Sequence, residues 1–347
     1  MYQKARHLIP SLVTLGALLI HAPVAQTDEL LLRDGSKITG TVVKRTNGTL
    51  EFDTAFAGTI KVKWSEVAEL TTDEPMEFML SDDSLVEVTH VTNNVDDMIV
   101  EDDSNAGQPA QTLGQDVIAS INPEPWQKGK GHKFTGVVNF AFERQRGNTD
   151  KDETDWDTNM TLRGKNDRFN LFGEYEKDRT DNETTAENWK LDGTYDYFYL
   201  PKWFTGGFIR LEHDKFADLD LRTSVGPTIG YQWFESKAMN LRTASGISYV
   251  DENFDEADDD SYAALPWNID FDMLVLDDFV TFYHKQTGFW NLEDTSDVIL
   301  DTWTGLRFPL VLGLVASTEL KYSYDNGAPD GVDKTDTTYS LKLGYSW

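Results

Sequence analysis

The last nine residues of the chain alternate strictly in hydropathy. Tyr339, Leu341, Leu343, Tyr345 and Trp347 are large and apolar or aromatic, and the residues between them are small or polar. Such alternation predicts a β-strand with one apolar and one polar face. In water a final strand of this kind would be an exposed edge that invites aggregation. In a bilayer it can close a β-barrel, with lipid on one face and the lumen on the other.

The same alternation recurs from residue 133 to the C-terminus. We predict twelve strands, at 133–145, 154–165, 168–178, 186–200, 203–214, 219–234, 238–250, 262–276, 279–291, 297–309, 312–325 and 335–347. A soluble β-sandwich can mimic two or three such hairpins, but it would not sustain the alternation over twelve segments.

The connections between these segments are expected to alternate in length. Five are short turns, and the other six are longer and mostly acidic: 146–153, 179–185, 215–218, 251–261, 292–296 and 326–334. Short periplasmic turns and longer external loops are typical of outer-membrane barrels. The strand number is even and both barrel ends fall on the short-turn side, so the preceding residues are expected in the periplasm.

Residues 27–125 show two similar stretches, offset by about fifty residues, that carry short alternating runs and turn signals. Leu32-Arg33-Asp34-Gly35-Ser36 opens the first, and Leu80-Ser81-Asp82-Asp83-Ser84 opens the second. We therefore predict small β units at 27–76 and 77–125, then a linker at 126–132 with Lys128 and Lys130. The predicted fold class is all-β: a 12-stranded antiparallel transmembrane β-barrel preceded by two small periplasmic β-barrel-like units.

Residues 1–26 have the features of a signal peptide. Lys4 and Arg6 precede a short apolar stretch, and small residues follow it. The apolar stretch is about 13 residues long, shorter than the roughly 20 that a helix needs to cross a bilayer. We expect export to the cell outer membrane, with the module at 27–125 in the periplasm.

Composition narrows the classes of function. The 347 residues include 31 Lys and Arg against 60 Asp and Glu, a formal charge of −29. Nucleic acid is therefore excluded as an expected partner, because phosphate recognition needs clustered basic side chains. Cysteine is absent, which excludes disulfides, thiolate metal sites and a cysteine nucleophile. No cofactor is expected.

One acidic region has two interpretations. From Trp64 to Gln127 the chain has no Lys or Arg but fifteen Asp and Glu. This surface either binds a basic periplasmic protein partner or is simply solvated, and we favour solvation because charge runs commonly serve solubility.

The polar face of the predicted strands carries both charge signs. The residues expected to line the lumen are Asp157, Arg163, Lys190, Asp192, Arg210, Glu212, Arg222, Arg242, Asp270, Asp272, Asp301, Arg307, Glu319, Lys321 and Lys342. They form either a hydrated channel or a lumen packed with ion pairs. Because twelve strands enclose less space than the 16–18 strands of large porins, we favour a narrow or occluded lumen.

Few residues are candidates for catalysis or metal binding. His213 and His284 lie in predicted strands, but neither stands in a recognisable nucleophile or metal-ligand spacing. We assign no catalytic and no metal residues, and a barrel enzyme that hydrolyses lipids or peptides is the alternative. The acidic loops 251–260 and 325–333 lack a calcium-loop spacing, so diffuse cation bridging to lipopolysaccharide is the preferred interpretation.

The order of several short motifs resembles a bacterial family of salt- or acid-stress-induced outer-membrane β-barrels that is known as a domain of unknown function. The motifs run from Leu31 to Val42, from Ala57 to Ile60 and from Trp64 to Leu70, followed by the barrel. The aromatic end, Tyr345 and Trp347, resembles the signal that the outer-membrane assembly machinery recognises. The resemblance implies a stress-associated envelope protein, either a narrow pore or a structural barrel, with outer membrane lipid and lipopolysaccharide as partners.

Overall fold

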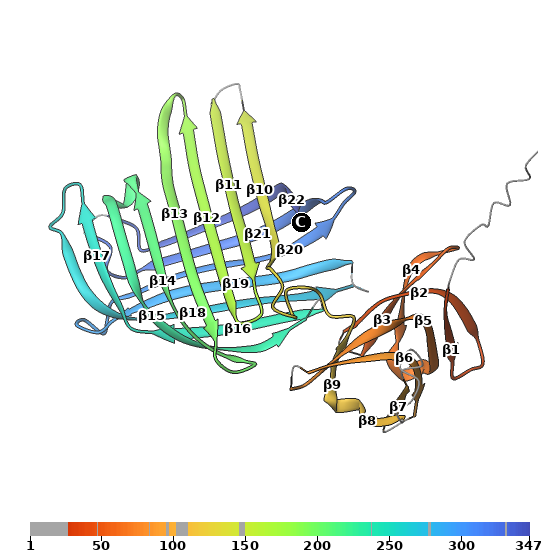
Figure 1. Cartoon of the computed structure of the whole chain (residues 1–347). Coiled ribbons are helices and arrows are strands. Elements are labelled where there is room, and N and C mark those ends of the chain that lie inside the picture. The colour runs from red at the N-terminus through yellow and green to blue at the C-terminus, as the bar shows by residue number, and fades with distance from the viewer. Residues whose placement is uncertain are drawn as a thin grey trace, which may run out of the picture. The chain divides into compact units, whose positions relative to one another are not determined.

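The computed structural model describes residues 27–46, 48–82, 84–94, 97–101, 110–145, 150–236, 238–276, 279–329 and 332–347. The chain divides into two compact units, with the boundary between Asn122 and Pro123 (Figure 1). The expected signal peptide, residues 1–26, lies outside the described residues and stays a prediction. Among the described residues, no helix has the length and apolar character needed to cross a membrane.

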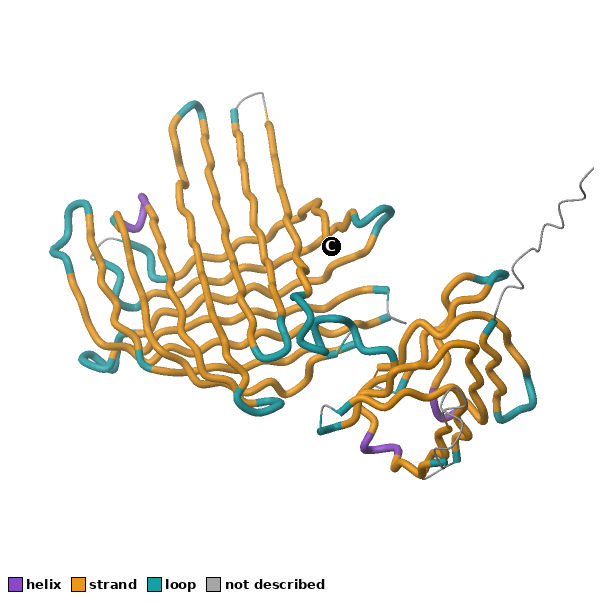
Figure 2. Tube along the Cα trace, viewed as in Figure 1, coloured by secondary structure: helices purple, strands orange, loops and turns teal. Residues whose placement is uncertain are grey.

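The N-terminal unit is a single sheet of nine strands. The strands are β1 (Asp28–Leu32), β2 (Lys37–Thr46), β3 (Thr49–Thr54), β4 (Gly58–Lys63), β5 (Val67–Leu80), β6 (Leu85–Asn93), β7 (Asp97–Glu101), β8 (Gln111–Gly114) and β9 (Ile118–Ile121). They follow the order β4-β3-β2-β1-β5-β6-β7-β8, and β9 pairs with β2 and β5. Two short 3-10 helices, η1 (Trp64–Glu66) and η2 (Gln115–Val117), interrupt the strands (Figure 2).

The two halves of this sheet repeat one another. The β1–β5 pairing has a bulge at Leu31 and Leu32, and the β5–β9 pairing has a bulge at Met79 and Leu80. The turns that follow also match: the carboxylate of Asp34 accepts the N–H of Ser36 at 2.8 Å, and that of Asp82 accepts the N–H of Ser84 at 3.0 Å. The boundary that we expected between residues 76 and 77 falls inside β5, so the two halves share this strand.

The halves also share one apolar core. Leu30, Leu50 and Phe52 from the first half and Phe78 and Val91 from the second half are fully buried in the same cluster. Full burial of such a side chain stabilises the fold by about 1.5–3 kcal/mol. The expected units 27–76 and 77–125 are therefore joined by a common interior.

The second unit is the barrel. Its strands are β10 (Lys133–Gln145), β11 (Lys151–Arg163), β12 (Asp167–Thr180), β13 (Glu183–Phe198), β14 (Trp203–Asp214), β15 (Leu219–Glu235), β16 (Met239–Gly246), β17 (Ser248–Phe254), β18 (Asp260–Val275), β19 (Val280–Asn291), β20 (Val298–Pro309), β21 (Leu314–Asp325) and β22 (Thr335–Ser346). A 3-10 helix, η3 (Lys215–Ala217), joins β14 to β15.

These thirteen strands form twelve staves. β16 and β17 are consecutive pieces of one stave, because both pair with β15 on one side and with β18 on the other. The pairing of β10 with β22 closes the ring. This confirms the predicted 12-stranded antiparallel barrel, and the strand bounds lie within a few residues of the predicted ones, apart from the two-piece stave.

We call the end of the barrel with Lys133 and Trp347 the terminus end, and the opposite end the loop end. At the loop end one expectation was wrong: the predicted connection 179–185 is only a two-residue turn, Asp181 and Asn182, because β12 and β13 extend further than expected. Both turn residues have positive φ, 52° and 69°, which is the geometry of a type I′ hairpin turn.

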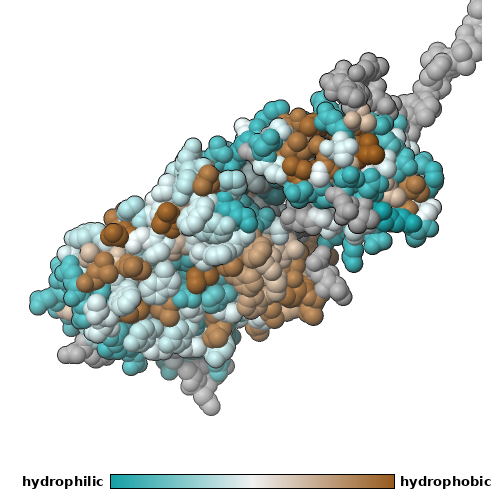
Figure 3. Space-filling view, turned by 90° about the horizontal axis from the view of Figure 1, so that it is seen from below, coloured by the Kyte–Doolittle hydropathy of each residue, from teal (hydrophilic) through white to brown (hydrophobic). Residues whose placement is uncertain are grey.

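The outer surface of the barrel is apolar and aromatic. Val225, Ile229, Leu191 and Trp233 are among many large side chains that are exposed on the strands. Figure 3 shows brown, hydrophobic side chains spread over this face among pale ones of intermediate hydropathy. Aromatic rings also pack edge to face along the wall, as Trp203, Tyr231 and Trp233 do with centroid separations of 4.9 and 4.8 Å. An apolar band with aromatic girdles is the expected surface of a barrel that faces lipid.

Candidate functional site in the barrel lumen

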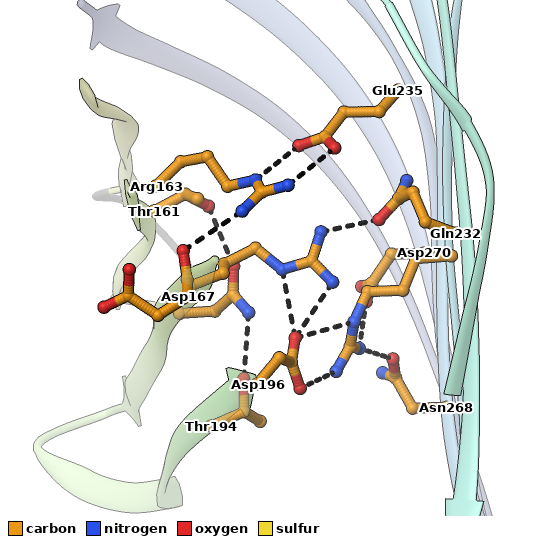
Figure 4. A network of polar contacts seen from close by, with 12 residues as sticks. Thr161, Arg163, Asp167, Thr194, Asp196, Gln232, Glu235, Asn268 and Asp270 are labelled. Carbon is orange, nitrogen blue, oxygen red and sulfur yellow. Dashed lines mark hydrogen bonds and ion pairs between the residues drawn. The ribbon is translucent and has the colours of Figure 1, made fainter. Parts of the chain in front are cut away.

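The first layer of the lumen, near the terminus end, is built around one carboxylate. Asp196 on β13 is fully buried and binds two guanidinium groups (Figure 4). Arg168 donates to its Oδ2 at 2.9 and 3.0 Å, and Arg242 donates to its Oδ1 at 2.9 Å. Arg168 also reaches Gln232 on β15 at 2.6 Å. One buried acid on β13 thus connects the neighbouring strand β12 with β16, three staves away around the ring.

Aromatic rings pack against these cations. The guanidinium of Arg242 lies 4.9 Å from the ring centroid of Phe204, and that of Arg168 lies 5.1 Å from Phe198. At the very end of the barrel, Arg163 on β11 pairs with Glu235 on β15 at 2.8 Å and stacks on Phe198 at 4.1 Å. Planar guanidinium groups favour both bidentate carboxylates and aromatic faces.

The middle layer is built around Asp301 on β20. Its carboxylate accepts the ammonium of Lys190 at 2.6 Å, the hydroxyl of Ser323 at 2.7 Å and the guanidinium of Arg210. Lys190 also pairs with Glu212 at 2.9 Å. Arg210 and Asp301 are each only 1% exposed, so this layer has almost no contact with solvent.

A second group lies beside this layer. The ammonium of Lys285 on β19 lies 3.2 Å from the ring centroid of Phe172 and 3.4 Å from the carboxylate of Asp192. The indole N–H of Trp303 donates to Glu174 at 2.8 Å, and Lys321 pairs with Glu174 at 3.0 Å. Aromatic rings therefore fill the space between the ion pairs.

Toward the loop end, Arg222 on β15 closes the network. It pairs with Glu252 at 2.5 Å and with Asp325 at 2.6 Å, and Tyr262 donates its hydroxyl to Glu252 at 3.0 Å. Glu252 was expected in the acidic external loop 251–261, and Asp325 where the predicted strand 312–325 meets the acidic stretch 325–333. The structure corrects the first: Glu252 lies in β17, because this strand extends into the expected loop, whereas Asp325 ends β21 at the predicted strand end, and both are lumen partners of Arg222.

The ion pairs of the middle layer cross the whole lumen. β13 and β20 are six staves apart in either direction around the ring, so Lys190 and Asp301 project from opposite walls. A lysine and an aspartate joined by a hydrogen bond span roughly 13 Å between their Cα atoms. A circular barrel of twelve strands would be about 24 Å across. The barrel is therefore flattened at this level, and side chains bridge it from wall to wall.

Each residue that the sequence predicted to line the lumen contacts at least one other polar, charged or aromatic side chain inside the barrel. Those not yet placed are Asp157 and Glu319, which both pair with Lys342 at 2.7 Å; Asp270, which pairs with Arg242; Asp272, which accepts from Asn240; and Arg307, which stacks on Tyr283. Glu174 and Asp196 also lie on the strand faces that were expected to point inward, whereas Arg168 and Lys285 were not predicted as lumen residues. Their positions in the alternation were the available signal.

One acidic cluster lies at the loop end, but not where the sequence suggested. Among the described residues, Asp155, Glu176 and Asp178 are the group whose carboxylate oxygens lie within 4.8 Å of one another. The loop between β17 and β18 is instead held by Asp218, whose carboxylate accepts the backbone N–H groups of Glu256 and Ala257 at 3.0 and 2.9 Å.

His213 and His284, the histidines of the barrel strands, have structural contacts, and His132, just before β10, lies 3.3 Å from the carboxylate of Asp167 at the start of β12. His284 Nδ1 lies 2.8 Å from the hydroxyl of Thr304, and His213 Nδ1 lies 2.8 Å from the backbone oxygen of Asp220. His213 also stacks on Trp189, with ring centroids 6.2 Å apart. The contacts of His213 and His284 do not form a serine–histidine or histidine–carboxylate pair.

The family follows from a comparison of the sequence with family models. The model described as "Protein of unknown function, DUF481" matches residues 138–347, well over half of the chain. The protein is a member of the DUF481 family. A search of curated proteins finds no match. The family match, the closed barrel and its apolar exterior make this DUF481 member an outer-membrane β-barrel.

Solved structures similar to this DUF481 chain are also barrels, at low identity. A NanC porin is 14% identical over 61% of this chain and 98% of its own, with a TM-score of 0.38. The translocator domain of the autotransporter NalP from Neisseria meningitidis is 10% identical over 63% and 88%, with a TM-score of 0.35. The outer membrane channel DcaP of Acinetobacter baumannii is 12% identical over 79% and 94%, with a TM-score of 0.30.

Proposed function

We propose that this protein is a structural envelope barrel without enzymatic activity, whose lumen is closed to ions. The observation that carries the proposal is the pairing of Lys190 with Asp301 across the full width of the barrel. Arg210 is almost completely buried beside this pair. An ion that crossed this layer would have to separate buried opposite charges, which costs several kcal/mol.

Planar-bilayer recording tests the closed lumen. The wild-type protein is expected to give no stepwise current at any voltage that the bilayer tolerates. A triple variant, Lys190→Ala, Arg210→Ala and Asp301→Ala, removes the bridging side chains and is expected to conduct in steps, which shows that the assay detects an open barrel. Regular steps from the wild-type protein would contradict the proposal and favour the narrow pore.

The non-enzymatic part of the proposal has its own test. The histidine contacts with Thr304 and the Asp220 backbone support it. Purified protein in detergent should leave phospholipid and peptide substrates intact. Hydrolysis that disappears on changing His213 or His284 to Ala would instead establish the alternative, a barrel hydrolase.

We further propose an orientation and a set of partners. The module at 27–122 would lie in the periplasm, where its acidic surface either stays solvated or meets a basic periplasmic protein. The barrel would contact outer membrane lipid and lipopolysaccharide, and Tyr345 and Trp347 would serve the outer-membrane assembly machinery. Added protease should leave the module intact in whole cells and degrade it once the outer membrane is opened. Cleavage in intact cells would reverse the orientation.

The salt- and acid-stress association is also part of the proposal. It rests on the resemblance of the motifs from Leu31 to Val42 and from Trp64 to Leu70. The amount of the protein is expected to rise after a shift to high salt or low pH, as measured by immunoblot. An unchanged amount under both shifts would remove this part.

A further inference from the structure

The barrel is closed unevenly at the seam between its first and last strands. β10 and β22 pair from Val137 with Ser346 to Phe140 with Leu343, and Gly136 and Trp347 extend this pairing with two backbone hydrogen bonds of 3.1 Å. In the described strands the pairing ends there. In Figure 1 the two strands meet near the C-terminus and diverge away from it.

Both strands nevertheless continue toward the loop end. β10 stays paired with β11 as far as Gln145, and β22 stays paired with β21 from Thr335 onward. The seam is therefore joined over its terminus half and parted over its loop half. Side-chain exposure agrees: Leu341 on β22 is 78% exposed, whereas Leu320 on the neighbouring stave β21 is 37% exposed.

The gap begins at membrane depth. The side chains that flank it on the outer surface, Phe142 on β10 and Tyr339 and Leu341 on β22, are large, apolar or aromatic and exposed. Open strand edges are not tolerated in the hydrocarbon region unless they line a water-filled cavity or are covered. A gap at this depth therefore requires a polar space behind it.

Such a space is present. A pocket lies behind the gap, lined by residues of β11, β12, β13, β21 and β22. β10 stands between β11 and β22 in the ring, yet contributes none of the described lining residues. The pocket therefore lies where β10 and β22 are no longer paired. Lys342 lies at the bottom of the pocket, where it pairs with Asp157 on β11 and Glu319 on β21.

The pocket has an excess of negative charge. Its lining holds five carboxylates, Asp155, Asp157, Glu174, Glu176 and Glu319, against two ammonium groups, Lys321 and Lys342. The two lysines pair at 3.0 Å or less with Asp157, Glu174 and Glu319. The surplus is therefore largest at Asp155 and at Glu176, near Asp178; Glu176 lies 4.0 Å from the ammonium of Lys321 and accepts the amide of Asn188 at 3.2 Å. A positively charged group complements this site.

We propose that the parted seam is a lateral opening in the barrel wall. Through it, a cationic amphiphile places its charged head group beside Asp155 and Glu176 and its apolar tail between Phe142 and Leu341. The opening faces the membrane and is separate from the axis of the lumen. The proposal thus goes beyond the structural role above and holds whether or not the lumen conducts ions.

Disulfide trapping tests the opening, and the absence of native cysteine gives a clean background. If the pairing continued in register, Phe142 would oppose Leu341, as Val138 opposes Tyr345 in the joined half. Opposed residues of an antiparallel pair are close enough for a disulfide. The control pair V138C/Y345C should oxidise almost completely, whereas F142C/L341C should remain reduced and react only with a longer bismaleimide.

Equal oxidation of the two pairs would overturn the opening. The shift of the folded band on unheated SDS gels reports whether each variant assembles. If F142C/L341C fails to assemble, the pair R144C/Y339C probes the same gap two residues further along, with the same expected and contradicting results.

Photo-crosslinking in liposomes tests the ligand class. The probes are octadecylamine and octadecanoic acid, each with a diazirine in the tail. The amine is expected to label the peptides that contain Phe142 and Leu341 several-fold more than the acid does. The double variant D155N/E176Q should abolish this preference, whereas the control D258N/D259N, which removes as much charge from the loop between β17 and β18, should retain it.

Equal labelling of the wild-type protein by both probes would overturn the cationic class, as would a preference that D155N/E176Q retains. Labelling confined to peptides remote from β10 and β22 would overturn the site itself. Neither result bears on ion conduction, so the lateral site and the closed lumen can fail independently.

Discussion

The two units of this chain are both all-β, yet their interiors are opposite in character. In the N-terminal sheet the fully buried side chains are apolar, as Leu30, Phe52 and Phe78 are. In the barrel, buried side chains include Asp196, Arg210 and Asp301 with a few aromatic rings between them, and many large apolar side chains are exposed on the outside. Each strand of either unit has two faces with period two. The surrounding solvent decides which face turns inward.

The two interiors also differ in what stabilises a buried side chain. An apolar core needs only close packing, whereas a charged interior needs a partner for every group. The barrel meets this with shared acids: Asp196 binds two arginines, and Asp301 binds Lys190 and Arg210. Loss of one acid therefore removes a counter-charge from two cations at once, and the acids that remain, such as Glu212 beside Lys190 and Asp270 beside Arg242, are left to balance them alone.

The largest effect is expected when a charge is removed from the interior of the barrel. Asp301→Asn should lower the free energy of unfolding of the barrel by about 3–5 kcal/mol, because removal of one partner from a buried ion pair leaves uncompensated charge. The measurement is urea unfolding in detergent micelles, followed by loss of the folded band on unheated gels. The N-terminal sheet, a separate compact unit, should keep its protease resistance.

A matched variant separates loss of charge from loss of pairing. Replacing the group by apolar residues, Asp301→Leu with Lys190→Met and Arg210→Met, should be close to neutral or stabilising, because apolar replacement of a whole buried ion group avoids its desolvation cost. Glu212 retains Arg222 as a partner in this variant. If the single and triple variants lose the same stability, the interior is not held by charge pairing.

Much of the barrel could be predicted from the sequence, because alternation with period two is a local property. The segment 203–214 was predicted with the bounds of β14, and the even-numbered face of the fourth segment, with Lys190 and Asp192, was placed inward. The partners of these residues could not be predicted. Which charge meets Asp301 depends on how far the ring flattens, and that is set by all twelve staves together.

Inward aromatic residues were the least predictable feature. Phe172, Phe204 and Trp303 are buried in the lumen, although aromatic residues in a barrel usually signal the lipid face. They lie beneath cations, as Phe172 does beneath Lys285. Alternation alone cannot distinguish a lipid-facing ring from one that packs under a charge on another stave.

The second largest effect is expected from arginine substitutions on the outer surfaces of the barrel and of the N-terminal sheet. Val225 on β15 and Val43 on β2 have similar exposure, 46% and 41%, but we place lipid around the first and water around the second. Val225→Arg should destabilise the barrel by about 2–4 kcal/mol, the cost of a cation on the lipid face near the midplane. Val43→Arg should change the stability of the sheet by no more than about 0.5 kcal/mol. Equal effects would contradict the assignment of the barrel surface to lipid.

The smallest effect compares the two halves of the N-terminal sheet. Hydrogen bonds from the backbone N–H of Ser36 and from the hydroxyl and N–H of Ser84 hold the pKa of the exposed Asp34 and Asp82 carboxyls below the usual value of 3.8. A lowered pKa in the folded state stabilises the fold above pH 3.8, and this contribution is lost as the pH falls through the folded-state pKa. Asp34→Asn and Asp82→Asn should each raise amide hydrogen exchange in their own turn at pH 7 and converge with wild type at acid pH. Because the two turns repeat one another, an effect in one alone would show that the halves are alike in topology but not in electrostatics.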